Sequence, residues 1–285
     1  MSEYGVLPAT GCEEMKDETR RLEILRISDT GAVKERDLVV REAPVTIFLN
    51  DVDLVTLLCS PKDFEYLAVG FLFAEGLITG KKDIKRIFAD NKDGVVWVET
   101  VDGKKPRDNI LARRFITTGC GKGLSFMGSP KHMKDLKATS DSKIQAGRVA
   151  LLMKEFQERS LIYRKTGGVH SAGLANARGI VAFNEDLGRH NAIDKILGEC
   201  VLKGIKTDNL ILMTSGRVSS DLLVKAARAR IPVIVSRSAP TDLSVRLARD
   251  LGITLVGFAR GSRMNVYSNE RRIAAGPTTR RKARR

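Results

Sequence analysis

Three stretches in the second half of the chain share one pattern and decide the fold: LILMTSGRVSS (210–220), PVIVSRSAPTD (232–242) and ITLVGFARGS (253–262). Each begins with a short, almost wholly apolar run, and an amphipathic helical pattern follows the polar residues of the first two. IVAFNEDLGRH (180–190) has the same form. Short apolar strands that alternate with amphipathic helices indicate a mainly parallel sheet with helices on both faces. The sequence therefore predicts an α/β domain.

The residues that follow these strands have a composition suited to binding an anion. Each of the three loops combines hydroxyl side chains, small residues and at least one arginine. Ligands of such sheets bind at the carboxyl ends of the strands, where helix N-termini and guanidinium groups attract phosphate. The alternative is that the hydroxyls only cap helices and the arginines pair with surface acids. We favour an anionic ligand because the pattern occurs three times, and we expect it to contact Arg217, Ser219, Ser236, Arg237 and Ser238.

Two further segments contain the histidines His170 and His190. TGGVHSAGL (166–174) is rich in small residues and leaves room for a ligand. EDLGRHNAIDK (185–195) opens a helix in which Asp194, four residues on, can orient His190 as a proton donor or a cation. A local surface pair is the alternative, and the spacing does not decide between them. No H-x-E, H-E-x-x-H or C-x-x-C pattern accompanies these histidines, so no metal site is expected.

Cys120 is the candidate for chemistry at sulfur. It lies between glycines in TTGCGKG (117–123), which we interpret as an exposed loop, and Lys122 can favour its thiolate. Cys59 and Cys200 have apolar neighbours and are interpreted as core residues. The four cysteines are widely spaced and the start of the chain is polar, so neither a disulfide framework nor export is expected.

The remaining composition suggests four zones: a disordered N-terminus (1–22), a smaller α+β unit (23–109), the α/β domain (110–268) and a basic tail (269–285). In the second zone we predict a hairpin turning at Asn50 and Asp51, then a helix capped by Ser60 that stops near Gly76, and we place Trp97 in the core.

The formal net charge is +15, to which the tail contributes strongly. The loops lack interleaved aromatic residues, so no specific nucleic-acid role is expected. No apolar run is long enough to span a membrane, and we expect a cytoplasmic protein.

Six motifs together closely resemble the FdhD/NarQ family, the formate dehydrogenase accessory sulfurtransferases. They occur in the family's order and the likeness covers about 42–267: TGCGKG (118–123), TGGVHSA (166–172), EDLGRHNAIDK (185–195), SGRVSS (215–220), SRSAPT (236–241) and GFARG (257–261). One of these motifs would be weak evidence, but six in sequence are specific.

The resemblance implies a cytidine-deaminase-like α/β core with a smaller N-terminal part, and a homodimer. It implies that a cysteine desulfurase delivers sulfur to Cys120 as a persulfide. That sulfur passes to a molybdenum or tungsten bis(pterin guanine dinucleotide) cofactor before insertion into the catalytic subunit of formate dehydrogenase, and GDP is expected to mimic this cofactor. His170 and His190 are expected at the cofactor, and the family's cofactor-contacting stretch matches Phe258, Ala259, Arg260, Gly261, Ser262 and Arg263.

Two features depart from the expected patterns. Many family members carry C-x-x-C at the sulfur loop, whereas this chain has Gly123 at the second position, so Cys120 must work alone or with a thiol from elsewhere. Deaminases use H-x-E with P-C-x-x-C around zinc, and this chain has neither. The alternative function is a chaperone that binds the cofactor without persulfide chemistry. Persulfide formation on Cys120 separates the two.

Overall fold

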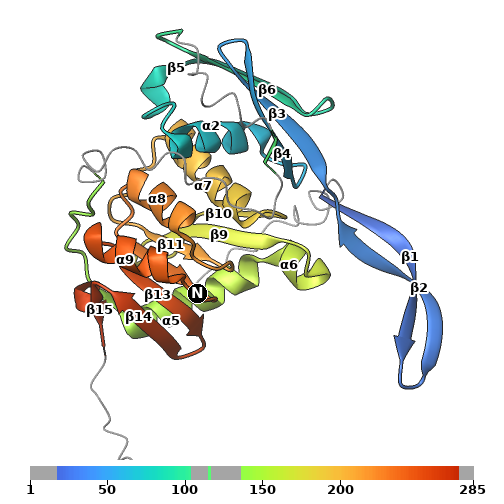
Figure 1. Ribbon diagram of the computed structural model, residues 1–285. Coiled ribbons are helices and arrows are strands. Elements are labelled where there is room, and N and C mark those ends of the chain that lie inside the picture. The colour runs from blue at the N-terminus through green and yellow to red at the C-terminus, as the bar shows by residue number, and fades with distance from the viewer. Residues whose placement is uncertain (1–17, 104–114, 117–135, 276–285) are drawn as a thin grey trace, which may run out of the picture.

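The larger sheet of the computed structural model, which describes residues 18–103, 115–116 and 136–275, has six strands in the order β10-β9-β11-β12-β13-β14 (Figure 1). Strands β11, β12 and β13 are parallel to one another, and β10, β9 and β14 run antiparallel to their neighbours. The strands are β9 (His170–Ala175), β10 (Ile180–Asp186), β11 (Ile211–Thr214), β12 (Val233–Ser236), β13 (Thr254–Arg260) and β14 (Arg263–Ser268).

The α/β class is therefore confirmed, but the expectation of a mainly parallel sheet is wrong. Only two of the five neighbouring pairs, β11 with β12 and β12 with β13, are parallel. Short turns join β9 to β10 and β13 to β14, and a short turn can connect only antiparallel strands. Strands β9 and β10 form an antiparallel hairpin, and β9 lies between β10 and β11.

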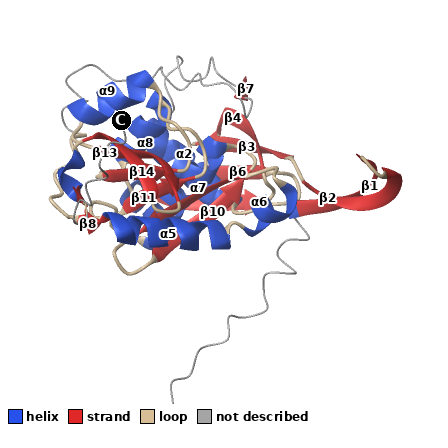
Figure 2. Cartoon of the chain, turned by 90° about the horizontal axis from the view of Figure 1, so that it is seen from below, coloured by secondary structure: helices blue, strands red, loops and turns tan. Residues whose placement is uncertain are grey.

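Helices cover both faces of this sheet, as predicted (Figure 2). Leu212 and Ile234 pack against the first group of helices, whereas Met213 and Val235 pack on the other side against α5. This alternation is the period of two that a strand buried on both faces requires. The first group is α7 (Arg189–Lys203), α8 (Ser220–Arg228) and α9 (Asp242–Asp250); the second is α5 (Ala146–Arg159) and α6 (Leu161–Thr166).

The smaller sheet has the strand order β5-β6-β3-β4-β7. Its predicted hairpin is confirmed, and both turn residues are left-handed, Asn50 with φ of 49° and Asp51 with φ of 63°. Two consecutive positive φ angles are the mark of the tight turn that best matches strand twist. The strands are β3 (Ala43–Leu49), β4 (Val52–Cys59), β5 (Ile84–Asp90), β6 (Val95–Thr100) and β7 (Phe115–Ile116), and η1 (Lys81–Asp83) precedes β5.

Trp97 does not lie in the core, contrary to the prediction. Its neighbours Val96 and Val98 in β6 are buried in the core cluster of the smaller sheet. Trp97 lies on the opposite face between Phe48 and Phe88, with ring centroids 5.6 and 5.4 Å away. Phe88 is 58% exposed. The apolar run Val95–Val98 resembles a strand buried on both faces, but among the described residues a helix covers only one face of this sheet.

Helix α2 (Phe64–Glu75) packs between the smaller sheet and α7. It begins at Phe64, so the predicted capping role of Ser60 is wrong, and it ends at Gly76 as predicted. The two helices cross in close contact at two glycines. A Cβ atom on Gly70 would lie 1.7 Å from the carbonyl oxygen of Asp194, and one on Gly198 would lie 1.9 Å from that of Tyr66. Only glycine allows this approach.

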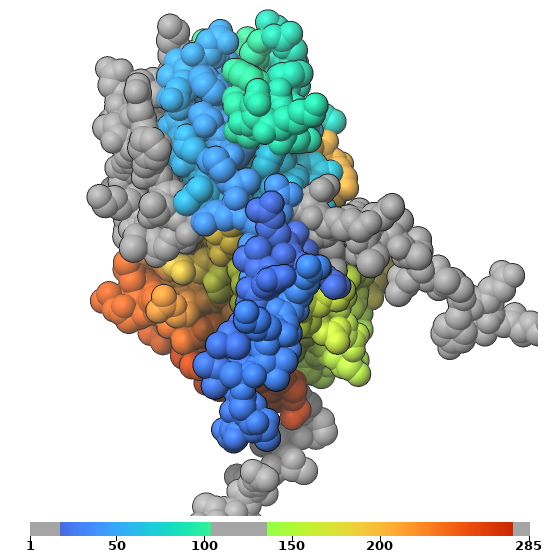
Figure 3. Space-filling view, turned by 90° about the vertical axis from the view of Figure 1, so that its right-hand side faces the viewer, coloured from blue at the N-terminus to red at the C-terminus, as the bar shows by residue number. Residues whose placement is uncertain are grey.

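Both predicted ends of the folded region need correction. A two-stranded arm of β1 (Thr19–Ser28) and β2 (Gly31–Val40) extends from the body, so residues 19–22 are not part of a disordered start (Figures 1 and 3). At the other end, η3 (Glu270–Arg272) is followed by β15 (Ile273–Ala274), which pairs with β8 (Ile144–Gln145). Arg272 is fully buried and donates to the carbonyl oxygens of Ser140 and Gly252. The rest of the predicted tail, 276–285, lies outside the described residues.

Candidate functional site

The loops after β11 and β12 meet at one edge of the larger sheet, as predicted. The buried hydroxyl of Ser236 donates to the carbonyl oxygen of Gly216 at 2.7 Å, and the backbone N–H of Arg237 donates to that of Thr214 at 3.2 Å. Ser236 therefore fixes one loop to the other and does not face the surface. Arg217 is exposed on the first loop, and Ser219, Arg237 and Ser238 are half-buried.

The third predicted loop is instead a hairpin. β13 continues to Arg260 and turns directly into β14. Phe258 has a φ of 51°, is 40% exposed and donates its backbone N–H to the carbonyl oxygen of Ser238 at 3.0 Å. Arg260 donates its Nε to the carbonyl oxygen of Arg237 at 3.1 Å. The hairpin thus joins the edge formed by the other two loops, and it exposes Arg260, Gly261, Ser262 and Arg263 while Ala259 is buried.

His170 reaches this edge from the start of β9. Its Nδ1 lies 3.3 Å from the hydroxyl of Ser215, which accepts the backbone N–H of Ser171 at 3.0 Å. Burial, and then the charge of Arg189, lowers the pKa of His170. The serine hydroxyl can therefore donate to Nδ1 of a neutral ring, which leaves the hydrogen on Nε2. A Cβ on Gly216 would lie only 3.1 Å from the Arg189 side chain, so a glycine keeps these groups together.

His190 also faces the loops, with its Nε2 3.5 Å from the hydroxyl of Ser219. Asp194 forms a buried ion pair with Lys225 at 2.5 Å, so neither interpretation left open for the His190–Asp194 spacing, an oriented histidine or a local surface pair, holds. Burial, followed by the charges of Lys225 and Arg189, lowers the pKa of His190 to about 3. The ring is therefore neutral at pH 7, so of the two roles considered for His190, proton donor and cation, the cation does not apply.

Most of the EDLGRHNAIDK motif is structural. Asp186 pairs with Lys195 at 2.8 Å, both fully buried, and accepts the backbone N–H of Ser60 at 3.0 Å. Glu185 accepts the backbone N–H groups at the start of α6. Only Arg189 and His190 of this motif extend toward the loops. Sequence reasoning did not select Arg189 or Ser215, although one begins the helix and the other directly follows β11.

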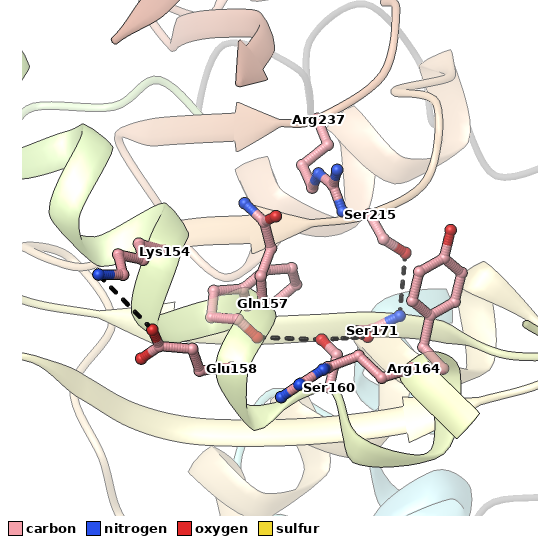
Figure 4. Close-up of a pocket in the computed structure, with 10 residues that line it drawn as sticks. Lys154, Gln157, Glu158, Ser160, Arg164, Ser171, Ser215 and Arg237 are labelled. Carbon is pink, nitrogen blue, oxygen red and sulfur yellow. Dashed lines mark hydrogen bonds and ion pairs between the residues drawn. The ribbon is translucent and has the colours of Figure 1, made fainter. Parts of the chain in front are cut away.

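A cavity of about 300 Å³ lies between this edge of the sheet and helices α5 and α6 (Figure 4). Ser171, Ser215 and Arg237 line it from the sheet side, and Gln157 and Arg164 from the helices. Sequence reasoning did not select the two helical residues, because α5 and α6 carry no motif. The Nε of Arg237 is buried without a hydrogen-bond partner in the described part of the chain.

Cys120 and the whole segment 117–123 lie outside the described residues. Cys59 and Cys200 are buried, and burial raises the pKa of each thiol to about 12, so their assignment to the core is confirmed. Within the described ranges, no group of three or more His, Cys, Asp or Glu side chains is arranged to hold a metal ion. No helix in those ranges is long and apolar enough to cross a membrane.

Comparison with known proteins gives the same family for sequence and structure. The sequence model of the FdhD/NarQ family matches residues 40–274. The sulfur carrier protein FdhD of Bacillus subtilis is 38% identical over 240 residues, which cover 84% of this chain and 92% of the relative. The protein of the same name from Listeria innocua is 40% identical over 237 residues, which cover 82% and 91%.

A solved structure with a similar fold points to the same family. The crystal structure of a candidate formate dehydrogenase accessory protein from Desulfotalea psychrophila superimposes with a TM-score of 0.74 at 29% sequence identity. The match covers 90% of this chain and 99% of that one. Because the family model matches residues 40–274 and these relatives are 38% and 40% identical over most of their length, the chain belongs to the FdhD/NarQ family.

Proposed function

We propose that this protein is a sulfur carrier in the maturation of formate dehydrogenase. The observation that carries the proposal is the match to the family over residues 40–274, together with relatives named as sulfur carrier proteins. The clustering of arginines and hydroxyls at one edge of the larger sheet supports it, because the carrier must hold an anionic acceptor while sulfur is transferred.

Cys120 accepts the sulfur in this proposal. Its thiolate attacks the outer sulfur of a persulfide on a cysteine desulfurase; an S–S bond forms on Cys120 as the donor's S–S bond breaks, and the donor cysteine leaves as a thiolate. This exchange needs no external oxidant or reductant. Cys59 and Cys200 are unsuited to it, because their raised pKa values keep them as buried thiols.

The acceptor in this proposal is a molybdenum or tungsten bis(pterin guanine dinucleotide), bound as substrate before it enters the catalytic subunit of formate dehydrogenase. Its phosphates suit the exposed guanidinium groups of Arg217, Arg260 and Arg263, and the neutral His170 and His190 can donate hydrogen bonds beside them. GDP carries the same phosphates and base and serves as its mimic. The protein acts in the cytoplasm as a homodimer.

Formate dehydrogenase activity in cells that depend on this chain tests the proposal. We expect Cys120→Ala to abolish the activity, because no other thiol takes over the sulfur. Cys59→Ala is the matched control: it removes a buried thiol and is expected to cost stability of about 1 kcal/mol while activity persists. Full activity with Cys120→Ala would leave only the role of a cofactor-binding chaperone.

A further inference from the structure

The ion pair between Asp194 and Lys225 connects the two helices that carry His190 and its serine contact. Asp194 follows His190 by four residues in α7, which places both side chains on one face of that helix. Lys225 belongs to α8, and its Nζ donates to both carboxylate oxygens of Asp194, at 2.6 and 2.5 Å. Helix α8 begins directly after Ser219, whose hydroxyl lies 3.5 Å from Nε2 of His190.

Both members of this ion pair are removed from solvent. Asp194 is 2% exposed and Lys225 is 8% exposed. Buried charges of this kind are stable as a pair, whereas either one alone would be strongly destabilising. The other charged groups that act on Asp194 are the acids Glu75 on α2 and Asp186 on β10, and neither can neutralise a carboxylate. Lys225 is therefore the cation with which Asp194 pairs.

The charged neighbours of His190 are all basic. Burial comes first in lowering the pKa of His190, followed by the charges of Lys225 on α8, Arg189 on α7 and His170 on β9. A carboxylate one helical turn away would act in the opposite direction, because an acid near a histidine favours the protonated ring. Asp194 is placed to do this by its spacing, but both of its oxygens are bound by Lys225.

We infer that Lys225 is a positioning residue for His190: it binds Asp194 away from the ring and thereby keeps His190 a neutral hydrogen-bonding group beside Ser219. A neutral ring presents one donor and one acceptor nitrogen, whereas a charged ring presents two donors. A residue on another helix thus decides which ligand groups His190 can contact. Only the identity of that ligand rests on the proposed function.

Carbon-13 NMR of the full chain with labelled histidine tests the inference, because the sequence contains three histidines and His190→Gln identifies the signal. We expect His190 of the wild-type protein not to titrate between about pH 5 and 8. Lys225→Met should raise its midpoint by at least about one pH unit, because a cation is lost and a carboxylate is released. Lys225→Arg is the matched control, since it keeps the charge and a donor for Asp194, and the ring should stay neutral.

The double variant Lys225→Met with Asp194→Asn separates the two effects of the lysine. It removes the ion pair without leaving a buried charge, and its midpoint should lie below that of Lys225→Met because no carboxylate remains to favour the charged ring. If Lys225→Met does not fold, Lys225→Gln takes its place in the comparison, because its amide can still donate a hydrogen bond to Asp194.

Three results would overturn the inference: a wild-type His190 that titrates near its ordinary value, an unchanged midpoint in the single variant, or equal midpoints in the single and double variants. The titration needs neither ligand nor sulfur. Its failure therefore leaves the carrier role to be decided by persulfide formation on Cys120. Absence of that persulfide, with the predicted midpoints, would reject the carrier role and keep the assignment of Lys225.

Discussion

His190 is the residue whose chemistry departs most from what its spacing suggests. It lies against Ser219 at the edge formed by the loops after β11 and β12, but Lys225 holds Asp194, so no carboxylate in the described part of the chain stabilises a charged ring. A neutral imidazole still donates or accepts one hydrogen bond at each nitrogen. His190 is therefore suited to contact a phosphate or hydroxyl oxygen at neutral pH rather than to supply a positive charge.

His190→Gln should make stability less sensitive to acid. The pKa of His190 is lowered from 6.5 to about 3, so the unfolded chain binds a proton there that the folded chain does not. Stability is then lost as pH falls through this window, and glutamine removes that loss. Burial raises the pKa of Asp194 from 3.8 to about 6, which acts in the opposite direction, but it is common to both proteins.

Urea unfolding at pH 7 and pH 4.5 measures this effect in the two proteins. We expect the wild-type protein to lose more free energy of unfolding between these pH values than His190→Gln, and we expect GDP affinity to fall in the variant while sulfur loading persists. Identical pH dependence would show that the ring titrates normally and is not desolvated.

The partners of single residues are difficult to predict from sequence when they come from another element of the fold. Residues four apart on a helix predict that His190 and Asp194 share a face, but Lys225 comes from another helix and forms the stronger contact. A buried charge that pairs with a residue from another helix leaves no sign of this pairing in the local sequence. The burial of Cys59 and Cys200 was predictable because apolar neighbours in sequence indicate a core element.

Among the elements, the crossing of α2 and α7 fixes how the two sheets are placed. Helix α2 is apolar on most of its surface, as expected for a helix covered on two sides. The smaller sheet covers one side, and α7 with its glycine contact covers the other. The same α7 begins with Arg189 and His190, so this crossing also positions the candidate site.

Gly198→Ala should destabilise the protein by several kcal/mol, because the added methyl group would overlap the backbone of α2 at Tyr66 and force the helices apart. Thermal unfolding measures the effect. Gly147→Ala, in α5, is the matched control, since a Cβ there meets nothing within 4 Å and alanine favours a helix by about 1 kcal/mol or less. Comparable melting temperatures for the two variants would contradict the close crossing.

Strands and helices were predictable where apolar periodicity is strong, as in β11, β12 and α8. Whether neighbouring strands pair parallel or antiparallel was not predictable, because this depends on which strand lies between two others, as β9 does between β10 and β11. Ser60 followed the pattern of a helix cap, but its backbone N–H and hydroxyl contact Asp186 and Leu187 across the junction between the sheets. Such long-range partners decide a residue's role without changing the local pattern.

At the scale of the whole molecule, the two sheets share a buried polar junction. Lys195 donates to the carbonyl oxygen of Ser60 at 3.0 Å and pairs with Asp186, which also accepts from Gly188 at the start of α7. The helix that carries Arg189 and His190 is thereby fixed to the smaller sheet as well as to the larger one. In the proposed function, this rigid site would hold the anionic acceptor while sulfur is delivered to it.

Mass spectrometry of the full chain after incubation with a cysteine desulfurase and cysteine tests the central claim most directly. We predict one added sulfur atom on the peptide that contains Cys120, removed by a thiol reductant and absent from Cys120→Ala, although Cys59 and Cys200 remain in that variant. Wild-type protein that gains no sulfur, or Cys120→Ala that gains as much as the wild type, would contradict the account.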